Sequence, residues 1–389
     1  MAVPQIHVYD PNSKRIRVVE NAKSLTWKRR WRGFGEWVLQ INAHLPNANY
    51  FIEDGFIGFY RGGQYRFGLI EFPKLTTGSK PDEDIWEFRG RDANAILNRR
   101  ILQNYQDLGT EFDEQDAVTR EAACRHYVDV EAINSFIPAN NIPNLSLEAD
   151  GGRGGTLSAP YKGRNQYLDE TISELCAAGT PDPLGWDVIY TPVDDSSADP
   201  GDLTFRIRSS RDKTTVKLST TFQSIRGSEY QHNLMNYRNV GVVGGAGEGT
   251  TRTFRTVDDG TSPTGISRRV VFIDASAYST NDEIDQYGAT RLMDYAGETS
   301  ITPEYNELGP FRYITDFDLG DKVTAKIQIR DVETLTVHEV VEAISTIVMV
   351  DEEYTESGER VKLTLGSEKP DLVDVVRRDR KQYLQTIRR

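Results

Sequence analysis

Apolar and polar residues alternate most clearly over residues 322–329. The apolar positions recur at every second residue, as Val323, Ala325, Ile327 and Ile329. A period of two predicts a β-strand with one buried and one solvated face. The strand follows a Gly320-Asp321 turn. In such a turn glycine supplies backbone freedom and aspartate a turn hydrogen bond.

The first segment, about residues 1–95, carries further strand patterns. They cover residues 6–9, 15–19, 27–41, 56–60, 65–72 and 85–90. Gly62-Gly63 lies between two of them and predicts a hairpin turn. We expect this segment to form a compact antiparallel barrel or sandwich.

The second segment, about residues 96–225, mixes helix and strand patterns. Residues 116–128 and 165–178 are predicted helices, and the second has an apolar stripe at Leu168, Ile172, Leu175 and Cys176. Gly179 and Pro181 are expected to end it. Residues 140–164 are expected to form a loop, and residues 185–190 and 203–207 a strand pair. The pattern leaves open whether strands near 203–225 return to the first segment.

The third segment, about residues 226–370, again consists mostly of strand patterns. They include residues 269–274, 340–350 and 361–365, with one helix capped by Asn281 or Asp282. Residues 371–389 form a basic C-terminal tail, either a solvated terminus or an arm that docks on an acidic partner. The predicted fold class is α+β, mainly β.

Composition narrows the functional classes. At 389 residues the chain is expected to hold two to four domains. A formal charge of −13 argues against nucleic-acid binding, which needs Lys and Arg to neutralise phosphates. The sequence predicts neither a secretory leader nor a transmembrane run, hence assembly in a cytoplasm. Two cysteines, Cys124 and Cys176, are expected to be buried free thiols.

Three motifs suggest ligand chemistry but lack its requirements. The glycine-rich loop at residues 244–249 lacks the following helix of a dinucleotide site and the Gly-Lys-Ser/Thr of a P-loop. His338 begins a His-Glu-x-x-Glu sequence, whereas a zincin needs a second histidine on a helix. The acidic run at residues 194–202 lacks EF-hand spacing and is expected to be a solvated hairpin tip.

Catalytic motifs are equally weak. The chain has no Gly-x-Ser-x-Gly, and Cys124 and His126 point in different directions on a helix. Its 59 acidic residues offer many carboxylate pairs, but no motif selects one. The basic residues interleaved with Trp27 and Trp31 are better explained by a strand whose faces alternate, with one face solvated or against an acidic neighbour.

The ordered set of three stretches is the strongest signal. Residues 27–41 (Trp-Lys-Arg-Arg-Trp-Arg-Gly-Phe-Gly-Glu-Trp-Val-Leu-Gln-Ile) precede the strand and glycine loop at 239–252, which precede the turn and strand at 317–329. This order and spacing resemble the tail-associated, baseplate-hub proteins of long-tailed phages, including the siphovirus Gp37-like group. The resemblance covers about residues 5–370.

The resemblance implies two tube-type antiparallel β-barrel domains separated by an α/β insertion: residues 1–95, 96–225 and 226–370. It also implies a homotrimeric ring, since three subunits with two barrels each match a sixfold tail tube. Expected partners are the distal tail or tube protein, the tape-measure protein and receptor-binding or fibre proteins. Sequence-specific nucleic acid and stable membrane insertion are not expected, and an acidic channel lining would let DNA pass.

We therefore expect a non-enzymatic structural hub at a virion tail tip, without catalytic residues, cofactors or metals. The residues selected for assembly interfaces, on exposed loops and strand edges, are Gly247, Glu248, Arg252, Gly320 and Asp321. Two alternatives stay open. One is a tail-associated peptidoglycan hydrolase, and the other is a carbohydrate-binding module that uses exposed aromatics such as Trp27 or Trp37.

Overall fold

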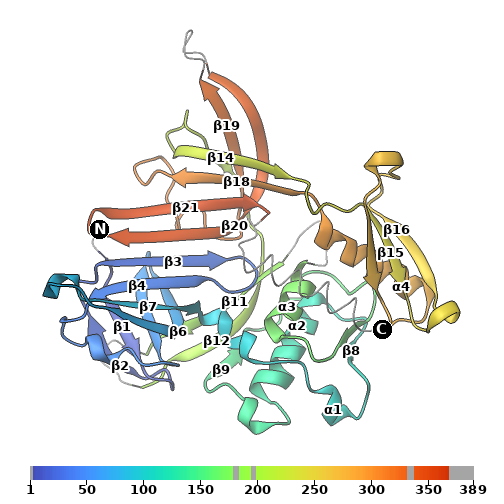
Figure 1. The fold of residues 1–389 in the computed structure, drawn as a ribbon, viewed down its shortest axis with the longest axis horizontal. Helices are drawn as coiled ribbons and strands as arrows, with labels where there is room; N and C mark the ends of the chain where they lie inside the picture. Colours follow the sequence, from blue (N-terminus) through green and yellow to red (C-terminus); the bar gives the residue numbers. More distant parts are fainter. Residues whose placement is uncertain (1–2, 178–183, 194–198, 331–336, 368–389) are drawn as a thin grey trace.

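In the computed structural model, strands from both ends of the chain form one sheet (Figure 1). The structure describes residues 3–177, 184–193, 199–330 and 337–367. The sheet has 13 strands, and its main path runs β14-β18-β21-β20-β3-β4-β7-β6-β5-β1-β2, with β13 and β19 attached through β20. The fold is thus mainly β, as predicted.

The first segment forms seven strands of this sheet. They are β1 (Ile6–Tyr9), β2 (Arg15–Val19), β3 (Ser24–Arg30), β4 (Glu36–Asn42), β5 (Phe56–Arg61), β6 (Gln64–Thr76) and β7 (Ile85–Asp92). The Gly62-Gly63 hairpin is confirmed, since both glycines have positive φ and β5 pairs with β6. The single strand expected over residues 27–41 is wrong, because the chain turns at Gly33 (φ 87°) and separates β3 from β4.

The second half of the sheet comes from the other end of the chain. Its strands are β13 (Asp212–Leu218), β14 (Ile225–Asn233), β18 (Glu298–Tyr305), β19 (Lys322–Arg330), β20 (Val337–Thr355) and β21 (Gly358–Gly366). β13 pairs with β19, so the strand that follows residue 210 joins the second half and not the first. As expected, Val323 and Ala325 of β19 are buried.

The seam between the two halves is a pair of antiparallel strands. Residues 24–30 of β3 run beside residues 349–355 of β20. The expected pair of closed barrels is therefore not observed: over the described residues the two β-segments share one open sheet, because β20 uses one edge for β21 and the other for β3. The open face of the seam alternates in charge, with Lys28, Asp351 and Lys362 opposite one another on neighbouring strands.

An α/β layer packs against the first half. Its elements are η3 (a 3-10 helix, Ala93–Arg99), α1 (Tyr105–Leu108), β8 (Asp113–Gln115), α2 (Arg120–Val128), a π-helix (Asp129–Ile133), β9 (Leu145–Leu147), β10 (Tyr161–Gly163), α3 (Leu168–Ala177), β11 (Leu184–Thr191) and β12 (Asp202–Ser209). Within the described residues β12 pairs only with β11 and β9. One core joins this layer to Tyr9, Phe67 and Leu69 of the first-half sheet. Both predicted helices are confirmed, α2 starting at the Thr119 cap.

A small α/β unit interrupts the second half. It consists of β15 (Val240–Gly244), β16 (Phe254–Asp258), β17 (Val270–Asp274) and α4 (Asn281–Leu292), inserted between β14 and β18, which pair with each other. Thr280, not Asn281 or Asp282, caps α4. The unit has its own core of Val243, Ile273, Ile284 and Leu292.

Short 3-10 turns lie at Ala48–Tyr50, Pro81–Glu83, Pro138–Asn140, Gly249–Thr251, Gly265–Ser267 and Met293–Tyr295. Three expectations fall wholly or largely outside the described residues: the Gly179/Pro181 helix end, the acidic tip from residue 194, and the basic tail at 371–389.

Candidate functional site

A buried network of charges crosses the seam. Arg66 of β6 donates to both oxygens of Glu352 on β20, at 2.8 Å and 3.3 Å. Tyr313 donates to the same carboxylate at 2.8 Å, and its hydroxyl accepts from Arg29 of β3. Arg29 in turn pairs with Asp318 at 2.7 Å. These bonds tie β3 and β6 of the first half to β20 and the 313–318 loop of the second.

The network fixes the charge state of its carboxylates. Burial alone would raise the pKa of Glu352, but Arg66, Arg29 and Arg61 lower it to about 2. Burial would likewise raise the pKa of Asp318, and Arg29 holds it well below its ordinary value. Both groups are therefore ionised at neutral pH.

Trp31 joins three parts of the molecule. Its backbone N–H donates to Val348 of β20 at 2.8 Å, and its carbonyl accepts from Trp186 of β11 at 3.2 Å. Its ring is 2% exposed and lies against two glycines, Gly185 and Gly320. A β-carbon on Gly320 would lie 2.0 Å from the ring, and one on Gly185 would lie 2.3 Å from it. First half, α/β layer and second half thus meet at one side chain.

The Gly320-Asp321 turn shapes this joint from the second half. Gly320 has φ 90°, which favours glycine. Asp321 accepts from the Asp318 N–H at 2.8 Å, which confirms the turn hydrogen bond, and it pairs with Arg211 at 2.7 Å. Both residues are buried, so the exposure expected of them is wrong. Their place in a subunit interface stays a prediction.

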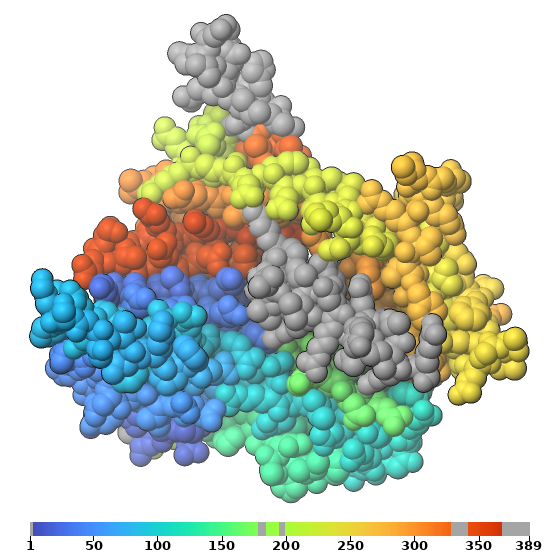
Figure 2. Space-filling model, viewed as in Figure 1, coloured from blue at the N-terminus to red at the C-terminus, as the bar shows by residue number. Residues whose placement is uncertain are grey.

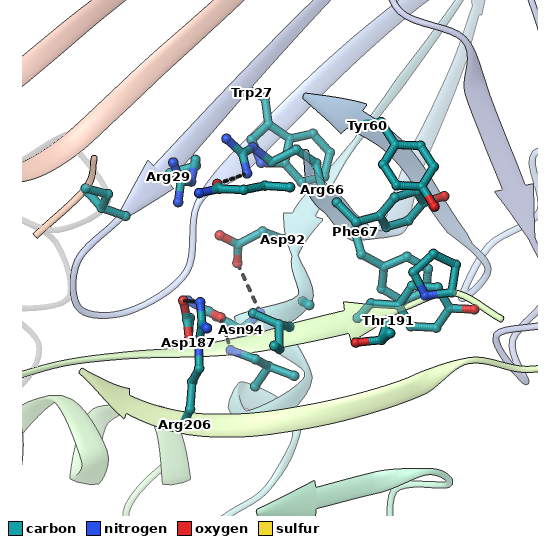
Figure 3. Close-up of a pocket in the computed structure, with 18 of the residues that line it drawn as sticks. Trp27, Arg29, Tyr60, Arg66, Phe67, Asp92, Asn94, Asp187, Thr191 and Arg206 are labelled. Carbon is teal, nitrogen blue, oxygen red and sulfur yellow. Dashed lines mark hydrogen bonds and ion pairs between the residues drawn. The ribbon is translucent and has the colours of Figure 1, made fainter. Parts of the chain in front are cut away.

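A pocket of about 480 Å³ opens beside the seam (Figure 3). Arg29 and Arg66 line one wall, Asp187 and Arg206 the opposite wall, and Asp92 lies between them. Both Asp187 oxygens accept from Arg206. The Asp92 oxygens accept from the Gly35 N–H at 2.9 Å and the Asn94 N–H at 3.2 Å. Each carboxylate oxygen of Asp92 and Asp187 thus already accepts a hydrogen bond from within the fold.

Asp92 gives the pocket a pH dependence. Burial raises the pKa of Asp92 to about 7, with a smaller contribution in the same direction from the negative charge of Asp187. The hydrogen bonds from the Gly35 and Asn94 N–H groups and the charge of Arg29 oppose this rise. Since the pKa is higher in the folded state, the stability from protonated Asp92 is fully present only below its ordinary pKa of 3.8 and is lost as pH rises through about 7. Wild-type stability should therefore fall from pH 5 to pH 8 relative to Asp92→Asn, by at most ~1.4 kcal/mol per pH unit, the limit for one proton.

Urea unfolding of both proteins across this pH range measures the difference. Asp54→Asn, at an exposed carboxylate, is the control and should follow the wild type. Parallel curves for wild type and Asp92→Asn would contradict the assignment.

The glycine-rich loop is the turn of the β15–β16 hairpin. Gly247 and Glu248 are exposed, and Gly247 has φ 108°. Arg252 closes the loop, donating to the carbonyls of Gly244 and Gly245 at 2.9 Å and pairing with Asp274. The structure therefore brings Gly247, Glu248 and Arg252 together in one hairpin turn. The Gly320-Asp321 turn belongs to a different part of the sequence.

The cysteines, histidines and tryptophans considered as candidates from the sequence lie in strands, helices or the core of the fold. Cys124 and Cys176 are buried free thiols, as expected. His126 pairs with Asp113 at 2.9 Å, and His338 lies in strand β20, not on a helix. Trp27 and Trp37 are buried, and their stacked rings have centroids 6.1 Å apart. The prediction that they are exposed and could stack on sugars is therefore wrong.

Two further surveys concern the described residues. No group of three or more His, Cys, Asp or Glu side chains there is placed to hold a metal ion. Among the helices of the same residues, none has the length and apolar character needed to cross a membrane.

Comparison with known families identifies the chain. Residues 5–367 match the model of the family described as Siphovirus ReqiPepy6 Gp37-like protein. The chain belongs to this family. The resemblance inferred from residues 27–41, 239–252 and 317–329 is thereby confirmed. Among curated proteins none matches the sequence.

Solved structures share the fold at low sequence identity. The 43 kDa tail protein of prophage MuSo2 from Shewanella oneidensis is 12% identical, with a TM-score of 0.56 over 93% of this chain and 98% of that one. A tail protein from Neisseria meningitidis is 11% identical, with a TM-score of 0.54 over 94% and 96%. Prophage tail protein gp18 from Listeria monocytogenes is 12% identical, with a TM-score of 0.51 over 97% and 99%. The likeness to each of these three structures covers at least 93% of this chain.

Sequence reasoning missed the seam residues of this Gp37-like chain. Arg29 shares a strand face with Trp27 and Trp31, and Glu352 shares one with Val350 and Tyr354. In each strand the period of two placed a charge on the buried face, which was the available signal. Their partners, almost 300 residues away, left no local trace.

Proposed function

We propose that this chain is a structural hub of the tail tip or baseplate of a long-tailed phage. It forms a homotrimeric ring that closes or extends the tail tube, and it works by shape rather than by catalysis. The observation that carries this proposal is the seam. One continuous sheet and its buried ion pairs join two β-halves into a rigid block, as a ring that transmits geometry requires.

The sheet also offers surfaces for ring closure. The two ends of its main path are β14 and β2, each paired on one side only within the described chain. A cyclic ring needs two different surfaces per subunit, and strand edges carry unused N–H and C=O groups. Three copies place six β-halves around the axis, which suits a sixfold tube.

The proposed partners follow from that position: the distal tail or tube protein above, the tape-measure protein within, and fibres or receptor-binding proteins outside. The proposed location is the virion, after assembly in the host cytoplasm. We assign subunit contacts to Gly247, Glu248 and Arg252. Gly320 and Asp321 serve them indirectly, by shaping the Trp31 joint.

Solution mass tests the ring. Light scattering behind size exclusion should give about 132 kDa, three times the 43.9 kDa of one chain. Negative-stain averages of that peak should show a threefold particle with a central hole. A species of 43.9 kDa at all concentrations would contradict an autonomous ring.

A zymogram on host cell walls separates this proposal from the hydrolase alternative. The pocket carboxylates Asp92 and Asp187 hold backbone and guanidinium donors, so we expect no clearing. Trp27 and Trp37 are buried and cannot serve the sugar-binding alternative. A glycan array with the intact protein tests whether other residues bind sugars.

A further inference from the structure

The two ends of the main sheet differ in how their outer edges are occupied. At the β2 end, the Val18 carbonyl accepts from the Asn47 side chain at 3.2 Å. The Ile16 carbonyl accepts from the Arg17 side chain at 2.7 Å. Proteins shield strand edges in such ways because an open edge is a template for pairing with another chain. The edge of β2 is therefore shielded.

The β14 end has a long strand without such shielding. β14 covers nine residues and contains neither lysine nor proline, the residues that usually blunt an edge. Its register with β18 is irregular only at its start, between Ile225 and Gly227. Residues 228–232 are all exposed, so both faces of the strand are solvated. The strand ends the main sheet and forms a yellow-green band at the surface (Figures 1 and 2), where a partner can reach it.

A proline on the neighbouring strand shows which backbone groups of β14 point outward. Ser228 lies opposite Pro303 of β18, which has no N–H to donate. Opposite residues in an antiparallel ladder alternate between hydrogen-bonded and non-hydrogen-bonded pairs, so this pair is a non-bonded one. Ser228, Tyr230 and His232 therefore direct their N–H and C=O groups away from β18. None of these groups makes a backbone hydrogen bond elsewhere in the described residues.

The spacing of these groups selects the kind of occupant. They recur at every second residue, roughly 7 Å apart, and an extended polypeptide presents matching donors and acceptors at the same interval. The side chains of residues 226–233 are polar apart from the Tyr230 ring, and they lie on two solvated faces. A strand added beside them stays solvated on both faces as well, so it carries polar side chains on both.

The sheet ends of a second copy do not fit this edge. Pairing β14 with β14 relates two copies by a twofold axis, which a threefold ring does not contain. The edge of β2 has its Ile16 and Val18 carbonyls already engaged. The strand that fits β14 therefore belongs to another protein.

We propose that β14 is the docking site for an extended, polar segment of a different protein, which adds to the main sheet as one more strand. The main chain of that segment bonds to the outward groups of Ser228, Tyr230 and His232. Of the two sheet ends considered for ring closure, this one is thereby assigned to another partner. The contact does not require the ring to form, so it goes beyond the proposed function.

Tyr230→Pro tests the edge. Proline removes the outward N–H of residue 230 and leaves the bonds of Glu229 and Gln231 to β18 in place, which is where edge strands tolerate proline. Tyr230→Ala is the matched control, since it loses the same side chain but keeps the N–H. The probe is a displayed library of random dodecapeptides, selected on the intact wild-type protein. Selected peptides should bind Tyr230→Pro at least tenfold more weakly than Tyr230→Ala, with both variants folded by circular dichroism.

Amide hydrogen exchange of the wild-type protein gives a second measurement that needs no variant. A bound peptide should slow exchange at Ser228, Tyr230 and His232 at least tenfold. Glu229 and Gln231, whose N–H groups already bond to β18, should change little. Peptides that bind both variants equally, a selection that yields no binder, or slowed exchange confined to other strands would each overturn the inference.

Self-association distinguishes the other source of a strand. Analytical ultracentrifugation should give the same mass for wild type and Tyr230→Pro at every concentration. An oligomer that Tyr230→Pro abolishes would mean that a second copy occupies the edge, and it would overturn the choice of a different protein. The wild-type mass alone decides the proposed trimer, so the two proposals fail separately.

Discussion

Replacing Glu352 by glutamine is expected to lower the free energy of unfolding by about 3–5 kcal/mol, the usual cost of removing one member of a buried ion pair. Glutamine keeps the shape but leaves Arg66 with no buried counter-charge at 2.8 Å. Tyr313 and Tyr354, which both donate to this carboxylate, lose a charged acceptor as well. Denaturant unfolding of wild type and variant measures the loss.

The neighbouring residue provides the control. Glu353 lies on the other face of β20, opposite Arg360 and Thr26, and it is partly exposed. Its replacement by glutamine should cost no more than about 1 kcal/mol, as for surface ion pairs. Equal effects at positions 352 and 353 would show that the seam does not depend on its buried charges.

The same residue predicts the acid response. The pKa of Glu352 is lower when folded, about 2, than its ordinary 4.5. The stability it provides is therefore present above about pH 4.5 and lost as pH falls towards 2. Unfolding free energies between pH 5 and pH 2 should fall more steeply for wild type than for Glu352→Gln.

The parts of the fold that could be predicted are those encoded within a few residues. The hairpin β5–β6 follows from Gly62-Gly63 between alternating strands, and β19 follows from its period of two. Strand β14 could not be found this way. Most of its side chains are exposed, so the polar sequence from Arg226 to Asn233 shows no alternation.

The topology lay beyond local patterns. The β3–β20 pairing joins residues more than 300 positions apart, and strand periodicity says which face is buried but not which strand is the neighbour. The barrel expectation failed for this reason. Each segment was assigned its own closed sheet, although β20 uses both of its edges to connect the two segments.

The site residues divide along the same line. Gly247, Glu248 and Arg252 were recognised as a loop, and the structure gathers them in one hairpin turn. Gly320 and Asp321 were recognised as a turn, but their surroundings include Trp31 and Arg211, which approach from distant parts of the chain. The local conformation of these residues could be predicted from the sequence, but the distant residues that surround them could not.

Gly320→Ala is expected to destabilise the protein by about 2–5 kcal/mol. A residue with a β-carbon at positive φ costs about 1–2 kcal/mol, and forcing extra volume into a packed core costs about 1–3 kcal/mol more. Both apply here, since Gly320 has φ 90° and its β-carbon would lie 2.0 Å from the Trp31 ring. Thermal and denaturant unfolding measure the sum.

Two other glycines separate the contributions. Gly33 has φ 87° with no atom within 4 Å of an added β-carbon, so Gly33→Ala should show the backbone cost alone. Gly185, on the other side of the same ring, has no positive φ but a contact of 2.3 Å, so Gly185→Ala should show the steric cost alone. If Trp31 is the rigid joint of three parts, Gly320→Ala exceeds both controls. A loss no larger than that of Gly33→Ala would mean that the ring can move aside, and that the three parts do not depend on it for their alignment.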